Sequence, residues 1–87
     1  MRLTITSHAQ KQIKKLPKSL QIILINRIRR LTVGDNFKSE KLSGYKNYFK
    51  IRIGDYRIVF IKYSKELEIV MVGHRREVYL LLKRFLG

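Results

Sequence analysis

Apolar and polar residues alternate from Tyr48 to Phe60, which is the pattern of half-buried β-strands. Gly54 and Asp55 interrupt the alternation, and a glycine followed by an aspartate suits a tight two-residue hairpin turn. Folding the segment about this turn places Ile51 opposite Ile58. One face of the predicted hairpin is therefore apolar, and the other face is basic.

The basic face of this hairpin breaks a local rule of sheet pairing. In the predicted register Arg52 lies directly opposite Arg57, and Lys50 shares their face because side chains alternate along a strand. Like charges that face each other across a strand pair are destabilising. Such a conflict without an evident compensating partner is expected at functional sites, and we therefore treat this face as the candidate site.

Upstream of the hairpin, apolar residues recur every three or four positions, which is the spacing of amphipathic helices. We expect a short strand over residues 2–6 and a first helix over about residues 8–16, with Ser7 as its N-cap. Pro17 ends that helix and starts a second one that reaches Leu31. Residues 32–41 are predicted to form a turn-rich loop.

Downstream of the hairpin, the run from Leu67 to Val72 is apolar at most positions, as in a strand that is buried on both faces. Residues 73–77 are predicted to be a connector, and residues 78–87 a short helix. The chain is therefore expected to form one α+β domain over residues 1–87. Its N-terminal helical hairpin would pack on a small antiparallel sheet, followed by the short C-terminal helix.

Strand register extends the candidate site beyond the hairpin. If the turn after the second hairpin strand has two or four residues, Arg57 lies opposite Val72, and Arg75 and Tyr79 follow closely. A turn of three or five residues shifts this pairing by one. Four cations would then converge at one end of the sheet face opposite the helical hairpin: Lys50, Arg52, Arg57 and Arg75. Cations beside an aromatic ring suit a phosphodiester with an adjacent base.

The charge of the chain points to a polyanionic partner. Twenty Lys and Arg residues stand against six Asp and Glu, a formal net charge of +14, which fits nucleic acid, an anionic membrane or an acidic protein. The chain has no cysteine, which excludes disulfides and thiolate metal sites. The N-terminus lacks the apolar core of a signal peptide, and no apolar run approaches a membrane span. We expect a cytoplasmic protein with no cofactor, no metal and no membrane partner.

Two segments, KLSGYKNYFKIRIGDYRIVF and VMVGHRREVY, resemble the RelE/ParE toxin superfamily and, within it, the RelE-like mRNA interferases of type II toxin–antitoxin systems. With the helical hairpin, the resemblance covers nearly the whole chain. It implies a RelE-like fold and a metal-independent, ribosome-dependent endoribonuclease that cuts mRNA in the decoding site. It also implies inhibition by an acidic RelB-like antitoxin, with operator DNA bound only through the toxin–antitoxin complex.

The resemblance also implies which residues act on RNA. The catalytic positions carried over are Lys50, Arg52, Arg57, Arg75 and Tyr79, and further RNA contacts are expected from Lys46, His74 and Arg76. Arg57 would stabilise transition-state charge with help from Arg75, and Tyr79 would stack on a base. Lys50 is the candidate proton acceptor, because a guanidinium such as that of Arg52 stays protonated.

The chain departs from the family pattern at two places. Arg52 replaces the second lysine of a pair found in some members, and the spacing from Arg75 to Tyr79 is two residues shorter than in some others. Two other functions stay open. One is a ParE-like toxin that inhibits DNA gyrase, although such members generally lack the full basic set with the terminal tyrosine. The other is a noncatalytic basic RNA-binding adaptor.

Overall fold

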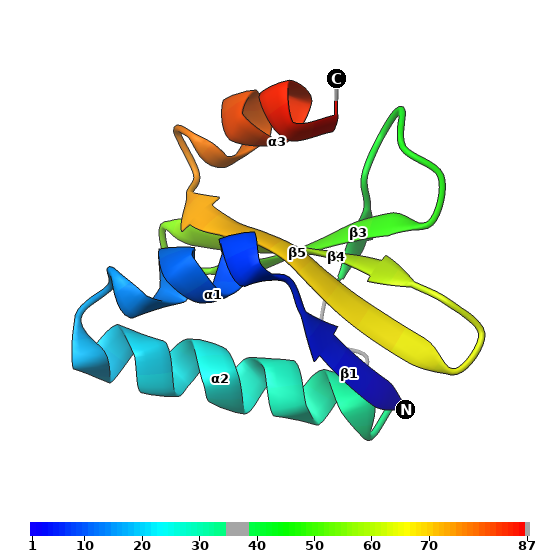
Figure 1. Cartoon of the computed structure of the whole chain (residues 1–87), viewed down its shortest axis with the longest axis horizontal. Helices are drawn as coiled ribbons and strands as arrows, with labels where there is room; N and C mark the ends of the chain where they lie inside the picture. The colour runs from blue at the N-terminus through cyan, green and yellow to red at the C-terminus, as the bar shows by residue number, and fades with distance from the viewer. Residues whose placement is uncertain (35–38, 87) are drawn as a thin grey trace.

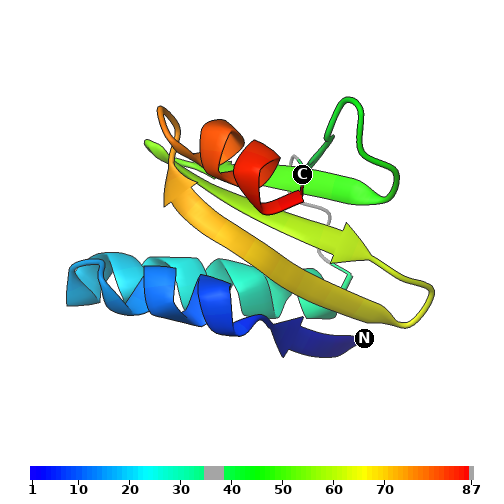
Figure 2. The same cartoon turned by 45° about the horizontal axis from the view of Figure 1, so that its top comes forward.

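The computed structural model describes residues 1–34 and 39–86, which form a five-stranded sheet with helices on both faces (Figure 1). The strand order is β1-β5-β4-β3-β2. The strands are β1 (Arg2–Ile5), β2 (Glu40–Lys41), β3 (Tyr48–Ile53), β4 (Tyr56–Lys62) and β5 (Glu66–His74). The helices are α1 (Ser7–Lys14), α2 (Lys18–Thr32) and α3 (Val78–Leu86). The predicted α+β fold is confirmed: α1 and α2 cover one face and α3 the other (Figure 2).

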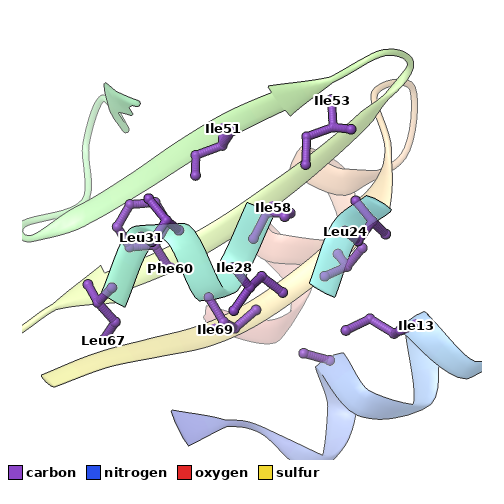
Figure 3. Close-up of a cluster of buried hydrophobic side chains, with 12 residues drawn as sticks. Ile13, Leu24, Ile28, Leu31, Ile51, Ile53, Ile58, Phe60, Leu67 and Ile69 are labelled. Atoms are coloured by element: carbon purple, nitrogen blue, oxygen red, sulfur yellow. The ribbon is translucent and has the colours of Figure 1, made fainter. Parts of the chain in front are cut away.

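The main hydrophobic core fills the space between α1, α2 and the apolar face of the hairpin (Figure 3). The predicted register is confirmed, because Ile51 pairs with Ile58 and Arg52 with Arg57. Leu24 of α2 is fully buried in this core. The three- and four-residue apolar spacing in the helices therefore directs one stripe of each helix onto the sheet.

A second core lies on the other face of the sheet, beneath α3. Val78 and Leu82 of the helix pack against Val59 of β4 and Met71 of β5, and all four are almost fully buried. Strand β5 contributes to both cores, which confirms that it is buried on both sides.

A β-bulge in β5 changes the register that the sequence predicts around Arg57. Lys62 of β4 pairs with Leu67 of β5, and four residues separate them. Regular antiparallel pairing from this point would place Val72 opposite Arg57. Val70, however, has no partner in β4, so the pairing shifts by one residue and Arg57 faces Gly73. The predicted pairing with Val72 is therefore wrong.

Three further details differ from the predictions for the N-terminal half. Strand β1 runs parallel to β5, whereas the other pairings are antiparallel as predicted. The N-cap of α1 is Thr6, not Ser7, because the Thr6 hydroxyl accepts a hydrogen bond from the Ala9 N–H at 3.1 Å. The predicted loop over 32–41 includes the short strand β2, and its residues 35–38 lie outside the described residues.

None of the helices in the described parts of the chain combines the length and the apolar content needed for a bilayer crossing.

Candidate functional site

The candidate site starts from the basic face of the hairpin. Arg52 of β3 and Arg57 of β4 are direct cross-strand partners, so their Cβ atoms are about 5 Å apart. Lys50 lies two residues before Arg52 and therefore on the same face. The two arginines differ in environment, because Arg52 is exposed whereas Arg57 is buried, with 6% of its surface accessible. The like charges are thus separated in depth rather than placed side by side in solvent.

Arg57 is the only polar or charged residue that is buried in the described chain. Its Nη1 donates hydrogen bonds to the backbone oxygens of Gly54, at 3.0 Å, and Tyr56, at 2.9 Å. Among the described residues, no carboxylate forms an ion pair with it. A guanidinium has five N–H donors, and a buried charge is costly without an anion. The side chain is held by the hairpin turn, while residues 1–34 and 39–86 offer its positive charge no acidic counterpart.

The neighbour of Arg57 in β5 and the start of α3 are in close contact. Gly73 pairs with Arg57, and a Cβ built at position 73 would lie 3.5 Å from the Val78 Cβ. The bulge therefore brings a residue without a side chain to the position opposite Arg57. This leaves α3 close to the sheet directly beside the buried guanidinium.

Lys50 lies between an aromatic ring and a carboxylate. Its Nζ is 5.1 Å from the centroid of the Tyr79 ring, within the range of a cation–π contact. It is also 3.9 Å from Oε2 of Glu40, which is the cross-strand partner of Lys50 in β2. The Tyr79 side chain stays partly open to solvent. The tyrosine from α3 and the lysine from β3 therefore meet on one face, as predicted.

Arg75 makes its contacts with the hairpin turn between β3 and β4 rather than with the face of the strands. Its backbone N–H donates to the Asp55 carbonyl at 2.7 Å, and its Nε is 3.7 Å from the Asp55 carboxylate. Both side chains are more than half exposed, so the ion pair itself contributes little stability. The backbone contact keeps the connector at the same end of the sheet as Arg57.

The other three residues expected to contact RNA are placed differently. His74 pairs with Tyr56 on the face of the main core, and the two rings meet edge to face at 5.6 Å. The His74 Nδ1 accepts a hydrogen bond from the Arg76 N–H at 3.2 Å. His74 therefore lies on the sheet face opposite Lys50 and Arg57. Arg76 and Lys46 are exposed, in the connector and in the loop before β3.

Two acidic residues in the site were not identified as site residues from the sequence. Glu40 lies in a two-residue strand that no pattern predicted, and Asp55 was considered only as a turn residue. Each forms an ion pair with one of the predicted cations. In residues 1–34 and 39–86, no three His, Asp or Glu side chains are grouped so that they could bind a metal ion.

The fold of this chain is that of the RelE toxins. The isolated E. coli RelE toxin superposes with a TM-score of 0.73 at 22% identity, covering 99% of this chain and 98% of that one. The intact E. coli RelBE toxin–antitoxin complex contains a chain that superposes with a TM-score of 0.74 at 21% identity. The match covers 84% of this chain and 94% of that one. A chain of the RelB–RelE antitoxin–toxin complex from Methanococcus jannaschii superposes with a TM-score of 0.73 at 22% identity. The match covers 90% of this chain and 96% of that one.

Sequence comparison assigns the chain to a family. Residues 3–79 match the family described as the ParE toxin of the type II toxin-antitoxin system, parDE. The chain therefore belongs to this toxin family, and the predicted membership of the RelE/ParE superfamily is confirmed. No curated protein matches the sequence.

Proposed function

We propose that this toxin is a ribosome-dependent endoribonuclease that cleaves mRNA in the decoding site. The observation that carries the proposal is Arg57, a buried guanidinium without an acidic partner among the described residues, on the sheet face that it shares with Lys50. A phosphate group would supply the anion that this environment lacks. Tyr79 adds an aromatic ring beside Lys50, which suits a nucleotide better than a bare phosphate.

The proposed reaction uses the RNA itself as the nucleophile. The 2′-hydroxyl loses its proton, its oxygen bonds to the adjacent phosphorus, and the bond from phosphorus to the 5′-oxygen breaks. The products are a 2′,3′-cyclic phosphate and a 5′-hydroxyl, which takes up a proton. The enzyme must accept the first proton, stabilise the charge that grows on the phosphoryl oxygens, and hold the groups in line.

The side chains divide these tasks by their chemistry. Arg57 stabilises the growing phosphoryl charge, because a fixed donor in a water-poor environment is effective without reorganisation. Lys50 is the proposed proton acceptor, and Tyr79 stacks on a base beside it. Arg75 and Arg52, both exposed, hold the flanking phosphates and remain protonated throughout.

The proposal includes an acidic RelB-like antitoxin as the inhibitor. RelE proteins of this fold have been solved as complexes with RelB, in E. coli and in M. jannaschii. A protein of formal charge +14 favours an anionic partner electrostatically. The toxin would act in the cytoplasm, where mRNA is translated, and would reach operator DNA only through the antitoxin.

A second candidate function is inhibition of DNA gyrase. The family match itself favours it, because the matched family is that of ParE toxins. In this case the protein would act by binding, and the arrangement of Lys50 beside Tyr79 would have no chemical role.

One experiment separates the two functions. The protein is synthesised in a translating extract, and mRNA ends and gyrase–DNA complexes are both mapped. A double variant, Lys50→Met with Arg75→Ala, is compared with a control that removes two exposed cations elsewhere, Lys62→Ala with Lys65→Ala. Cuts within translated codons that the first variant loses and the control keeps support the RNase. Intact mRNA with trapped gyrase complexes would refute it.

A further inference from the structure

The β3–β4 turn is the common attachment point of two arginines that come from different parts of the chain. The carbonyl oxygens of Gly54 and Tyr56 accept hydrogen bonds from Nη1 of Arg57, at 3.0 and 2.9 Å. The carbonyl oxygen between them, that of Asp55, accepts the backbone N–H of Arg75 at 2.7 Å. Three consecutive residues of one turn therefore bind Arg57 from β4 and Arg75 from the connector before α3.

The side chains of the two arginines are held to different degrees. The guanidinium of Arg57 is buried and fixed by two hydrogen bonds. The side chain of Arg75 is 52% exposed, and within residues 1–34 and 39–86 its single polar contact joins Nε to Oδ1 of Asp55, at 3.7 Å. An arginine side chain without such a contact samples many rotamers. The Asp55 carboxylate is therefore the group that restricts the position of the Arg75 guanidinium.

The turn itself does not require an acidic residue at position 55. Gly54 has a φ of 57°, and Asp55 is not among the positive-φ residues of the described chain, which is the pattern of a type II′ turn. Asn suits such turns as well as Asp does. An acid beside two cations also weakens their attraction for a phosphate. The presence of Asp rather than Asn therefore points to a role for its charge.

We propose that Asp55 is a positioning residue, whose carboxylate orients the Arg75 guanidinium relative to Arg57 for the cleavage of RNA. The inference rests on the proposed function, in which Arg57 acts on the scissile phosphate and Arg75 holds a flanking one. A guanidinium has five N–H donors, so an arginine that meets Asp55 through Nε keeps the donors of its two Nη atoms for a phosphate. Because both arginines are attached to the same turn, Asp55 fixes the position of the flanking phosphate relative to the scissile one.

Removal of the Asp55 charge has two effects of opposite sign. The protein becomes more positive beside the RNA, which favours binding. At the same time the Arg75 side chain regains its rotamer freedom, so the flanking phosphate is held less firmly and the attacking oxygen is in line less often. A positioning role therefore predicts slower cleavage without weaker binding, whereas a general disruption of the site would weaken both.

The test compares Asp55→Asn, which suits the same turn, with Glu77→Gln as its control. Glu77 is exposed, lies two residues after Arg75, and forms no ion pair with it in the described chain. Each substitution reduces the six acidic residues to five, so the formal net charge rises from +14 to +15. Single-turnover cleavage on programmed ribosomes is measured against toxin concentration, which gives the maximal rate and the half-saturating concentration. Both substitutions are also made in an Arg75→Ala background, and thermal melting verifies that every variant folds.

Asp55→Asn is expected to lower the maximal rate by about 5- to 50-fold, with a half-saturating concentration equal to or below that of the unmodified protein. Glu77→Gln is expected to leave the maximal rate unchanged. In the Arg75→Ala background, Asp55→Asn should cause no further loss, because Asp55 acts through Arg75.

Three results would overturn the proposal. They are a maximal rate of Asp55→Asn equal to that of Glu77→Gln, a clear rise in its half-saturating concentration, and an undiminished loss in the Arg75→Ala background. In the last case Asp55 would support only the turn. If the unmodified protein leaves mRNA intact, the proposed function is refuted, and this inference with it.

Discussion

Among single residues, Arg57 connects the stability of the hairpin with its proposed chemistry. One end of the guanidinium binds two backbone oxygens of the turn that the sequence places at Gly54 and Asp55. The remaining donors are free of any carboxylate in the described chain. A substitution here should therefore change both folding and catalysis, and the two effects can be measured separately.

Replacing Arg57 with Ala is expected to lower mRNA cleavage by about 100- to 1,000-fold, the usual cost of removing one donor that stabilises transition-state charge. It is also expected to destabilise the fold by about 1–3 kcal/mol, because two partly buried hydrogen bonds to backbone oxygens of the turn are lost. Urea unfolding and cleavage assays measure the two effects. Arg52→Ala is the control for stability, since Arg52 is exposed, and an equal loss of stability there would contradict this account.

Lys50 and Glu40 are the two groups that could take the proton of the 2′-hydroxyl, and they lie 3.9 Å apart. If Lys50 is the acceptor, Lys50→Met should lower the cleavage rate by about 100- to 10,000-fold. Glu40→Gln keeps the shape of the side chain and should change the rate by less than about tenfold. Single-turnover cleavage on programmed ribosomes gives both rates. A larger loss for Glu40→Gln would assign the proton transfer to the carboxylate.

Among the secondary-structure elements, α3 has two roles, one on each side of the helix. Its buried residues close the second core, and Tyr79 faces Lys50 at the candidate site. Its far end also contacts α1, since the rings of Phe85 and His8 stack with centroids 5.2 Å apart. The helix is therefore a structural cover for the sheet as well as a source of site residues.

A matched pair of leucines tests the structural part of α3. Leu82 is almost completely buried, whereas Leu80 in the same helix is more than half exposed. Leu82→Ala should destabilise the protein by about 2–5 kcal/mol, through lost burial and the cavity that remains. Leu80→Ala should change stability by less than about 0.5 kcal/mol. Denaturant unfolding of both variants distinguishes them, and similar values would mean that α3 does not pack as described.

The sequence predicted those elements whose pattern is local. Alternation gave the pairing of Ile51 with Ile58, and with it the opposition of Arg52 and Arg57. The bulge could not be predicted, because Val70 and its neighbours are uniformly apolar and no glycine marks the irregularity. The parallel pairing of β1 with β5 joins segments more than 60 residues apart, and alternation alone does not specify a partner strand.

The sequence predicted the part of the candidate site that follows from the pairing register of β3 with β4. Lys50, Arg52 and Arg57 share a face as expected, and Tyr79 reaches Lys50. The burial of Arg57 and the ion pair of Lys50 with Glu40 depend on α3 and β2, whose positions are set by tertiary packing. His74 was placed with the RNA-contacting residues from its position beside Arg75, but alternation in β5 directs it to the other face.

Across the whole molecule, positive charge covers both faces of the sheet. Residues 1–34, which form β1, α1 and α2, carry cations without acids, and the opposite face carries the cations of the candidate site together with acidic residues such as Glu40 and Glu68. Such a charge distribution attracts an anionic partner from most directions of approach.

The association rate with an acidic antitoxin should therefore depend steeply on salt. Between about 0.05 and about 0.5 M salt it is expected to fall by about 10- to 100-fold, because exposed charges are screened over shorter distances. The dissociation rate should change much less, since it depends on contacts already formed. Stopped-flow mixing with the antitoxin gives both rates, and an association rate insensitive to salt would rule out electrostatic steering.

The unpaired Val70 has a consequence for how relatives of this protein are compared. Insertions and deletions are normally confined to surface loops. Here one residue could be lost from the middle of a central strand, and Gly73 would still face Arg57. The reason is that the β4–β5 pairs beyond Val70 are already shifted by one residue, as if Val70 were absent. Relatives without the bulge should thus align with a one-residue gap inside β5. An aligner that moves this gap into the turn before β5 would pair the wrong residues along the part of the strand that precedes Val70.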